Sequence, residues 1–301
     1  MSREAESLRQ DLQDILQACR HLPPEERLEL AVVLRGWADS QADLAPVPEG
    51  GFPGQFGMIG DSASMQVVYD LLAKIVHAEA TVLIAGETGT GKELVAKALH
   101  QHGPRRKGPF IAVNCAAIPA TLLESEIFGH RKGAFTGAHQ DRKGYADAAA
   151  GGTLFLDEIG EMPLELQSKL LRFLENGEVR PVGANLAHQV DVRMVAASNR
   201  DLLSRVKERA FREDLYYRLA VLVVDLPPLR ERAGDLELLA HFILRQSAES
   251  GLPSGTLTGP AMEALGKHSW PGNVRELQNV LVRASAFCKD GEIKPEDLFP
   301  S

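Results

Sequence analysis

The 301-residue sequence lacks the features that mark secreted, membrane-spanning and nucleic-acid-coating proteins. It has only three cysteines, Cys19, Cys115 and Cys288, whose scattered positions fit neither a metal-ligand set nor a disulfide framework, which favours a reducing compartment. No run of about 18 apolar residues is present, so no segment is predicted to span a membrane. The net charge of −8 argues against a chain that coats nucleic acid. The charged first residues contain no apolar core of a secretory signal, and the sequence predicts a cytoplasmic protein.

The composition is that of a soluble globular protein with room for more than one domain. Hydrophobic residues make up 44% of the chain and charged residues 25%. Residues 3–19 and 25–37 carry apolar side chains at helical spacing, and residues 45–55 are rich in proline and glycine. We therefore predict a short helical N-terminal segment over residues 1–44 and a linker over residues 45–55. The segment either packs on the main domain or on a second copy of itself, or it has a regulatory role.

Five short apolar, β-branched runs alternate with helical patterns in the central part of the chain. They lie at residues 81–86, 109–115, 152–158, 190–199 and 219–226. Strands that are apolar along their whole length and are separated by helices indicate a parallel sheet covered on both faces. We predict a three-layer α/β domain over residues 56–229. The β pattern stops after two consecutive prolines, and residues 230–301 are predicted to form a smaller, all-helical domain.

A glycine-rich sequence follows the first of these predicted strands and leads into a helical segment. It reads GETGTGKE and matches the phosphate-loop pattern G-x-x-x-x-G-K in the strand–loop–helix context that this pattern requires. Its glycines allow backbone N–H groups to surround phosphate oxygens (Gly86, Gly89 and Gly91). Lys92 supplies a cation for the β- and γ-phosphates. Glu93 stands where a Ser or Thr hydroxyl usually binds magnesium, so the metal needs other ligands.

Two carboxylates follow the apolar strand sequence GGTLFL, namely Asp157 and Glu158. The C-terminal ends of parallel strands form the ligand-binding edge of an open α/β sheet. Asp157 is suited to hold Mg²⁺ through water, and Glu158 is suited to polarise an attacking water. Such a pair often only caps a following helix, but behind a phosphate loop it indicates hydrolysis of a nucleoside triphosphate.

The sequence FREDLYYRL places two arginines, Arg212 and Arg218, six residues apart. On a helix this spacing is about 600° of rotation, so both side chains could reach one edge of the domain. An arginine supplied by a neighbouring subunit accelerates phosphoryl transfer by about 10³ to 10⁵. Solvated helix residues are the alternative interpretation.

The sequence GHRKGAFTGAHQ (residues 129–140) puts an aromatic and a hydroxyl residue, Phe135 and Thr136, between small residues and basic ones. Such neighbours are unlike those of a core phenylalanine. We predict a mobile loop with these two side chains at its tip, and an ordinary surface turn is the alternative.

Taken together, the motifs resemble those of the bacterial σ54-dependent transcriptional activators, which are AAA+ ATPases. The matching sequences are GETGTGKE, ESEIFGHRKGAFTGA, GGTLFLDEIGEMP, FREDLYYRL, LPPLRER and WPGNVREL, in the family's order, and they cover about residues 56 to 288. The phosphate loop and the carboxylate strand are shared with many ATPases, whereas GAFTGA looks like the loop with which this family contacts σ54. The resemblance implies an AAA+ P-loop domain of three αβα layers, followed by a small helical lid.

The resemblance also implies a role for individual residues, with ATP and Mg²⁺ as cofactors. The nucleotide would be bound by Ile59 and Gly60 near the adenine and by Gly86, Glu87, Thr88, Gly89, Thr90, Gly91, Lys92, Glu93 and Leu94 around the phosphates. Asp157 and Glu158 would hold the metal and the catalytic water, and Asn114 would restrain Glu158 until a partner binds. Asn199 and Arg275 would sense the γ-phosphate, and Arg212 and Arg218 would reach into the adjacent subunit of a homo-oligomeric ring, expected to be a hexamer. The contact with σ54 would be made by Gly133, Ala134, Phe135, Thr136, Gly137 and Ala138 near promoter DNA.

The sequence departs from the family at two points. Arg131 stands where an acidic residue is usual, which would make the base of the loop more cationic. The family usually continues into a C-terminal helix-turn-helix, for which the residues after the lid are too few. Residues 260–287 outline two helices around a turn, but their low positive charge favours the lid over a DNA reader. The rival functions are a DNA-handling AAA+ machine of the helicase or loader type and an ATP-dependent scaffold.

Overall fold

The computed structural model describes residues 53–253, 255–288 and 291–299. These residues belong to one compact unit, Phe52–Ser301. The helices predicted at residues 3–19 and 25–37, and most of the predicted linker, lie outside the described residues. Within the described part, no helix has the length and apolar character needed to cross a bilayer.

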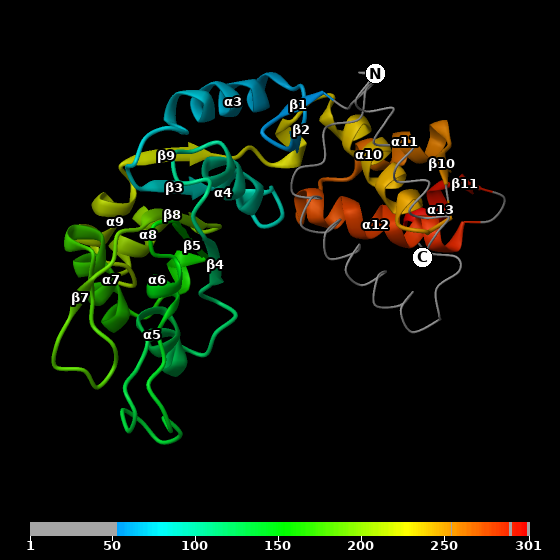
Figure 1. The fold of residues 1–301 in the computed structure, drawn as a ribbon. Coiled ribbons are helices and arrows are strands. Elements are labelled where there is room, and N and C mark those ends of the chain that lie inside the picture. The colour runs from blue at the N-terminus through cyan, green and yellow to red at the C-terminus, as the bar shows by residue number, and fades with distance from the viewer. Residues whose placement is uncertain (1–52, 254, 289–290, 300–301) are drawn as a thin grey trace, which may run out of the picture. The chain divides into compact units, whose positions relative to one another are not determined.

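The centre of the fold is a five-stranded parallel sheet with the strand order β4-β5-β8-β3-β9 (Figure 1). Every neighbouring pair in this sheet is parallel. The strands are β3 (Val82–Ala85), β4 (Phe110–Asn114), β5 (Thr153–Asp157), β8 (Arg193–Ser198) and β9 (Leu222–Asp225). Each of the five lies inside one of the runs predicted from the sequence, and the parallel α/β fold is confirmed.

Successive side chains of the sheet enter two different cores, because neighbouring residues of a strand point to opposite faces. In β3, Val82 and Ile84 pack in one core and Leu83 in the other. The first core is closed by α3 (Ala63–Ile75) and α4 (Lys92–Gln101). The second is closed mainly by α5 (Ala120–Phe128), α7 (Leu164–Asn176), α8 (Leu202–Lys207) and α9 (Glu213–Leu219). Burial on both faces explains why the central strands β3, β5 and β8 have no polar alternation, whereas the edge strands β4 and β9 are partly exposed.

A third core lies in the C-terminal helical part. Its helices are α10 (Asp235–Glu249), α11 (Gly259–Lys267), α12 (Asn273–Phe287) and α13 (Pro295–Leu298). They bury Trp270, Leu277 and Leu281 between them. The part is not all-helical as predicted, because β10 (Thr256–Leu257) and β11 (Glu292–Ile293) form a short parallel pair. Two residues per strand are too few for a periodic pattern to reveal.

Smaller elements were also not predicted from the sequence. A two-stranded pair, β1 (Gly54–Gln55) with β2 (Met58–Ile59), precedes α3, and the hairpin of β6 (Glu178–Val179) with β7 (His188–Gln189) follows α7. The remaining elements are α6 (Tyr145–Ala148) and the 3-10 turns η2 (Ile159–Glu161) and η3 (Leu229–Glu231).

Candidate functional site

The glycine-rich loop connects β3 to the first residue of α4, as its sequence predicts. Lys92 begins this helix and is 7% exposed. Its ammonium group donates hydrogen bonds to the carbonyl oxygens of Gly86 (2.9 Å) and Glu87 (3.1 Å). Burial lowers the pKa of Lys92, while the nearby carboxylates of Glu158 and Asp157 act in the opposite direction. The ammonium therefore lies within the loop, next to the N-terminus of a helix, where phosphate binding is favoured.

Asp157 and Asn114 are the last residues of the adjacent strands β5 and β4 and are paired in register. The side-chain amide of Asn114 donates to Asp157 Oδ2 at 3.5 Å, and its carbonyl oxygen accepts from the backbone N–H of Ala116 at 2.9 Å. The predicted restraint of Glu158 by Asn114 is not the contact seen here, because the amide is turned toward the neighbouring aspartate. That restraint stays a prediction for another state of the site.

Glu158 has a left-handed backbone conformation with φ of 52°. Its carboxylate accepts a hydrogen bond from the backbone N–H of Asn199 at 3.4 Å, and burial raises the pKa of Glu158. The side chain of Asn199 donates to the hydroxyl of Thr88 in the phosphate loop at 3.0 Å. A strained backbone and a carboxylate with a raised pKa are features that cluster at catalytic sites.

A cavity of about 330 Å³ joins the phosphate loop, the carboxylates and the lid. Among the predicted site residues, its lining includes Ile59, Thr88, Gly89, Thr90, Gly91, Lys92, Glu93, Leu94, Asn114, Asp157, Glu158 and Arg275. Gly60, Gly86 and Glu87 lie next to lining residues in the chain but outside the lining itself. Asn199, which follows β8, is also outside the lining and contacts it through Thr88 and Glu158. A larger cavity of about 610 Å³ is lined by Arg218 and Val221 and includes no residue of the phosphate loop.

The lid helix α12 begins directly against the phosphate loop. The N–H of Val274 donates to the carbonyl oxygen of Gly89 at 3.0 Å. A Cβ on Gly89 would lie 2.2 Å from the carbonyl oxygen of Gly272, so this close approach requires glycine. Arg275 follows in the first turn and lines the cavity. The end of α12 that would enter a DNA groove is therefore packed on the phosphate loop, as the lid interpretation requires.

Sequence reasoning missed the residues that hold the carboxylate of Glu87. Arg230 donates two hydrogen bonds to it, at 2.6 and 2.8 Å, and Asn273 Nδ2 donates a third at 3.1 Å. These contacts, first those of Arg230, lower the pKa of Glu87 to about 2. Asn273 is fully buried, with φ of 52°, and also donates to the carbonyl oxygen of Thr88. The motifs LPPLRER and WPGNVREL contain both partners, but nothing in their spacing points to Glu87.

Neither of the two predicted finger arginines lines the cavity at the phosphate loop of its own chain. Arg212 is the N-cap residue that precedes α9 and does not lie within the helix. The helical rotation predicted between the two arginines was therefore wrong. Its guanidinium binds the carboxylate of Asp214 through two hydrogen bonds, at 2.9 and 2.6 Å. Arg218 lies in α9 and donates to the carbonyl oxygen of Leu174 at 3.2 and 3.3 Å.

The GAFTGA segment forms a loop that projects beyond α5 (Figure 1). Gly133, Phe135, Thr136 and Gly137 are exposed, Ala134 is half-buried and Ala138 is buried. Phe135 is 37% exposed and its ring contacts that of His130 edge-on, with the centroids 4.9 Å apart. Gly133 and Gly137 flank the tip with φ of 80° and 103°, in the left-handed region that favours glycine. Neither has an atom within 4 Å of the position of a Cβ. The two glycines are thus required by the bends of the backbone and not by crowding.

The base of this loop is closed by a carboxylate. Asp141 accepts a hydrogen bond from Arg131 Nη1 and another from the backbone N–H of Lys132 at 2.8 Å. The backbone N–H of Arg131 donates to the carbonyl oxygen of Val182, in the β6–β7 hairpin, at 2.9 Å. The extra positive charge expected from Arg131 is therefore balanced by Asp141, ten residues later.

Comparison with known proteins places this arrangement in a family. Residues 58–225 match the family described as "Sigma-54 interaction domain", and residues 230–301 match "AAA+ ATPase lid domain". The chain belongs to the sigma-54 interaction domain family. The resemblance to the σ54-dependent activators, the AAA+ P-loop fold and the helical lid are thereby confirmed.

Similar proteins are transcriptional regulators. The chain is 50% identical over 273 residues to the DNA-binding transcriptional regulator NtrC of Azospirillum brasilense, covering 90% of this chain and 57% of NtrC. It is 49% identical over 257 residues to the Nif-specific regulatory protein of Azotobacter vinelandii, covering 85% and 49%. A crystal structure of Brucella abortus NtrX in complex with ADP has a TM-score of 0.77 and 33% identity, over 92% of this chain and 61% of NtrX. The chain thus spans about half to three-fifths of the length of these relatives.

Proposed function

We propose that the chain is an ATP-hydrolysing activator that remodels the closed complex of σ54 RNA polymerase to open promoter DNA. The observation that carries this proposal is the exposed loop with Phe135 and Thr136 at its tip. The loop belongs to the same α/β domain as the phosphate loop, within a family whose description is sigma-54 interaction. An exposed tip with one aromatic and one hydroxyl side chain is suited to bind a protein partner and release it.

Binding and hydrolysis of ATP are assigned to the residues around the cavity. Lys92 would exchange its contacts with loop carbonyls for the β- and γ-phosphates of ATP, which are stronger acceptors. Glu158, with its raised pKa, would orient and polarise the attacking water. Asn199 already bonds Thr88 in the phosphate loop and so could report the γ-phosphate. Arg275 would add a second positive charge from the lid.

The donor set at this edge of the sheet fits Mg²⁺. Asp157 and Glu158 offer carboxylate oxygens, which magnesium prefers, and the phosphates and water would complete the shell. Within the described residues no three His, Cys, Asp or Glu side chains converge as a metal site, so the nucleotide must supply ligands. Glu93 is not an obvious ligand, because it pairs with Lys97 at 3.3 Å. When bound, magnesium would neutralise charge on the phosphates.

A homo-oligomeric ring, expected to be a hexamer, would complete the site. Arg212 and Arg218 do not line the cavity at the phosphate loop of their own chain, which suits arginines that act on a neighbour's nucleotide. To do so Arg212 would leave Asp214, and Arg218 would leave the carbonyl oxygen of Leu174.

Replacement of the loop hydroxyl tests the proposal directly. Thr136→Ala should abolish open-complex formation on a σ54 promoter and leave ATP hydrolysis largely unchanged, because the nucleotide site is untouched. Thr256→Ala, at an exposed threonine of the lid strand β10, is the matched control and should change neither activity. Open-complex formation that persists in Thr136→Ala would remove the loop from the mechanism.

The rival functions are separated by two further measurements on the same chain. A scaffold that needs ATP only to assemble would release no phosphate, whereas the proposed enzyme releases phosphate and Glu158→Gln does not. A helicase or loader would hydrolyse ATP faster when DNA is added. The proposed activator requires no DNA for hydrolysis, so stimulation by DNA alone would favour the rival.

A further inference from the structure

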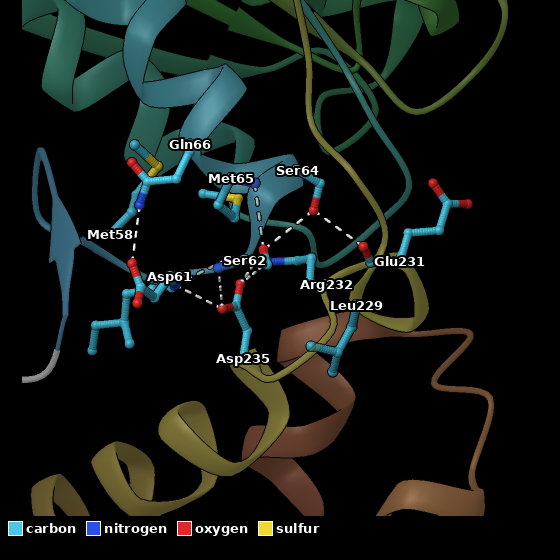
Figure 2. A network of polar contacts seen from close by, with 12 residues as sticks. Met58, Asp61, Ser62, Ser64, Met65, Gln66, Leu229, Glu231, Arg232 and Asp235 are labelled. Atoms are coloured by element: carbon cyan, nitrogen blue, oxygen red, sulfur yellow. Dashed lines mark hydrogen bonds and ion pairs between the residues drawn. The ribbon is translucent and has the colours of Figure 1, made fainter.

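A fully buried carboxylate joins the lid to the segment that precedes α3. Asp235 is the first residue of the lid helix α10 and has no exposed surface. Its Oδ1 accepts from the backbone N–H groups of Asp61 (2.7 Å) and Ser62 (2.9 Å). Its Oδ2 accepts from the hydroxyl of Ser62 (2.9 Å) and from Arg232 Nε (3.1 Å). Figure 2 shows these bonds converging on the one carboxylate.

Arg232 extends the same network toward the predicted adenine segment. It is 5% exposed, and its Nη2 donates to the carbonyl oxygen of Ile59 at 3.0 Å. A Cβ on Gly60 would lie 2.5 Å from Asp235 Oδ2 and 3.1 Å from Arg232 Nη2, at a φ of 152°. Glycine at this position is thus explained by the close approach of the ion pair to the backbone.

The network reaches the nucleotide cavity through Arg232, which is one of its lining residues. The lining includes an apolar group, Met58, Ile59, Met65 and Leu239, together with Arg232, and a second group from the phosphate loop. The first group is called the base end below. A flat aromatic base fits an apolar lining of this kind, and a triphosphate fits the phosphate loop. Leu239 lies in α10, one turn after Asp235, and Ile59 lies in β2. The ion pair therefore ties together the two elements that face each other across the base end.

We propose that Asp235 and Arg232 are positioning residues for the nucleotide base. They fix the distance between the backbone of residues 59–62 and the first turn of α10. Ile59 on one side and Leu239 on the other can then contact the base at the same time. The inference rests on the proposed function, because it takes the cavity to be the ATP site.

The test compares a ligand that has a base with one that has none. Asp235→Asn keeps the size of the side chain but turns an amide N–H₂ toward Arg232 Nε and the Ser62 hydroxyl, or toward the two backbone N–H groups, so donors meet donors. The Kd of ATP should rise about tenfold, while the Kd of inorganic tripolyphosphate, measured by competition, should stay within about twofold. A merely structural defect would weaken both ligands alike, which would overturn the inference.

One further variant replaces Asp235→Asn if that protein does not fold, and another serves as the control. Ser62→Ala removes one of the four hydrogen bonds to Asp235 and should raise the Kd of ATP less than Asp235→Asn does, again without an effect on tripolyphosphate. Ser62→Ala is the variant to be compared with wild type if Asp235→Asn does not fold. Glu249→Gln is the matched control, because this carboxylate lies on the same helix and its pair with Arg245 is exposed.

The remaining outcomes are also decisive. Unchanged ATP binding in folded Asp235→Asn, or in Ser62→Ala where Asp235→Asn does not fold, overturns the inference. Wild-type chain that binds ATP but releases no phosphate overturns the proposed function alone, since the comparison of the two ligands needs only binding.

Discussion

The buried guanidinium of Arg193 should be a major source of stability for the phosphate-loop domain. Arg193 is the first residue of β8 and is 1% exposed. Its Nη1 donates to the carbonyl oxygens of Val76 (3.1 Å) and Leu99 (2.8 Å), at the C-terminal ends of α3 and α4. These carbonyls have no partner within their helices, and they lie at the negative ends of the helix dipoles. A Cβ on Gly103 would lie 2.7 Å from Nη1, so glycine leaves room for the group.

The structure sets the size of the effect expected for Arg193→Met. Each of the two short hydrogen bonds to a charged donor contributes about 1.5–3 kcal/mol, and both carbonyls become unsatisfied. The variant gains in return, because no cation has to be buried. We expect a net loss of about 2–4 kcal/mol, which lowers Tm by about 4–16 °C in a domain of this size. The helix α4, which carries the phosphate loop at its other end, should become less rigid.

Thermal and urea unfolding of the full chain, followed by circular dichroism, measure this loss. Arg172→Met, at an exposed arginine of α7, is the matched control and should lie within about 0.5 kcal/mol of wild type. Arg193→Lys should be intermediate, because lysine keeps the cation but lacks the planar guanidinium with its fixed donors. An Arg193→Met protein as stable as wild type would show that the buried charge costs as much as its bonds contribute, and would refute the reasoning.

Two further predictions concern charge pairs near the functional sites. The pKa of Glu87 is lowered from its usual 4.5 to about 2, chiefly by Arg230, so its ionised form stabilises the fold above about pH 4.5 and this contribution is lost as the pH falls toward 2. Urea midpoints should therefore fall more steeply between pH 4.5 and 3 in wild type than in Glu87→Gln, and parallel curves would contradict the pair. In the loop, Arg131→Glu should speed hydrogen exchange of the backbone at residues 129–142. Adding Asp141→Arg should slow the exchange again, by an opening free energy of about 0.2–1 kcal/mol, the range of exposed pairs. No restoration in the double variant would show that the two side chains do not interact.

The features that were predicted correctly depend on short stretches of chain. The five strands follow from apolar runs whose β-branched residues suit a sheet buried on both faces. The phosphate loop follows from glycines at fixed spacing before a helix, because only that backbone can surround phosphate oxygens. Phe135 could be recognised as exposed because its neighbours are small or basic, and the structure bears this out. The roles of the individual site residues, including Asn114, Asn199 and Arg275, and the domain boundaries stay predictions.

The missed features join residues far apart in the chain. Asn273 meets Glu87 across 186 positions, and Asp235 meets Asp61 across 174. No periodicity or spacing relates such pairs, since each residue has an ordinary local sequence and only the packing of lid on sheet brings them together. Arg131 illustrates the same limit at shorter range, because its charge could be read from the sequence but its balance by Asp141 required the path of the loop. Local patterns thus specify the strands and the phosphate loop through backbone preferences and burial, whereas the contacts that position Glu87, Asp235 and Arg131 arise only when distant segments are packed against each other.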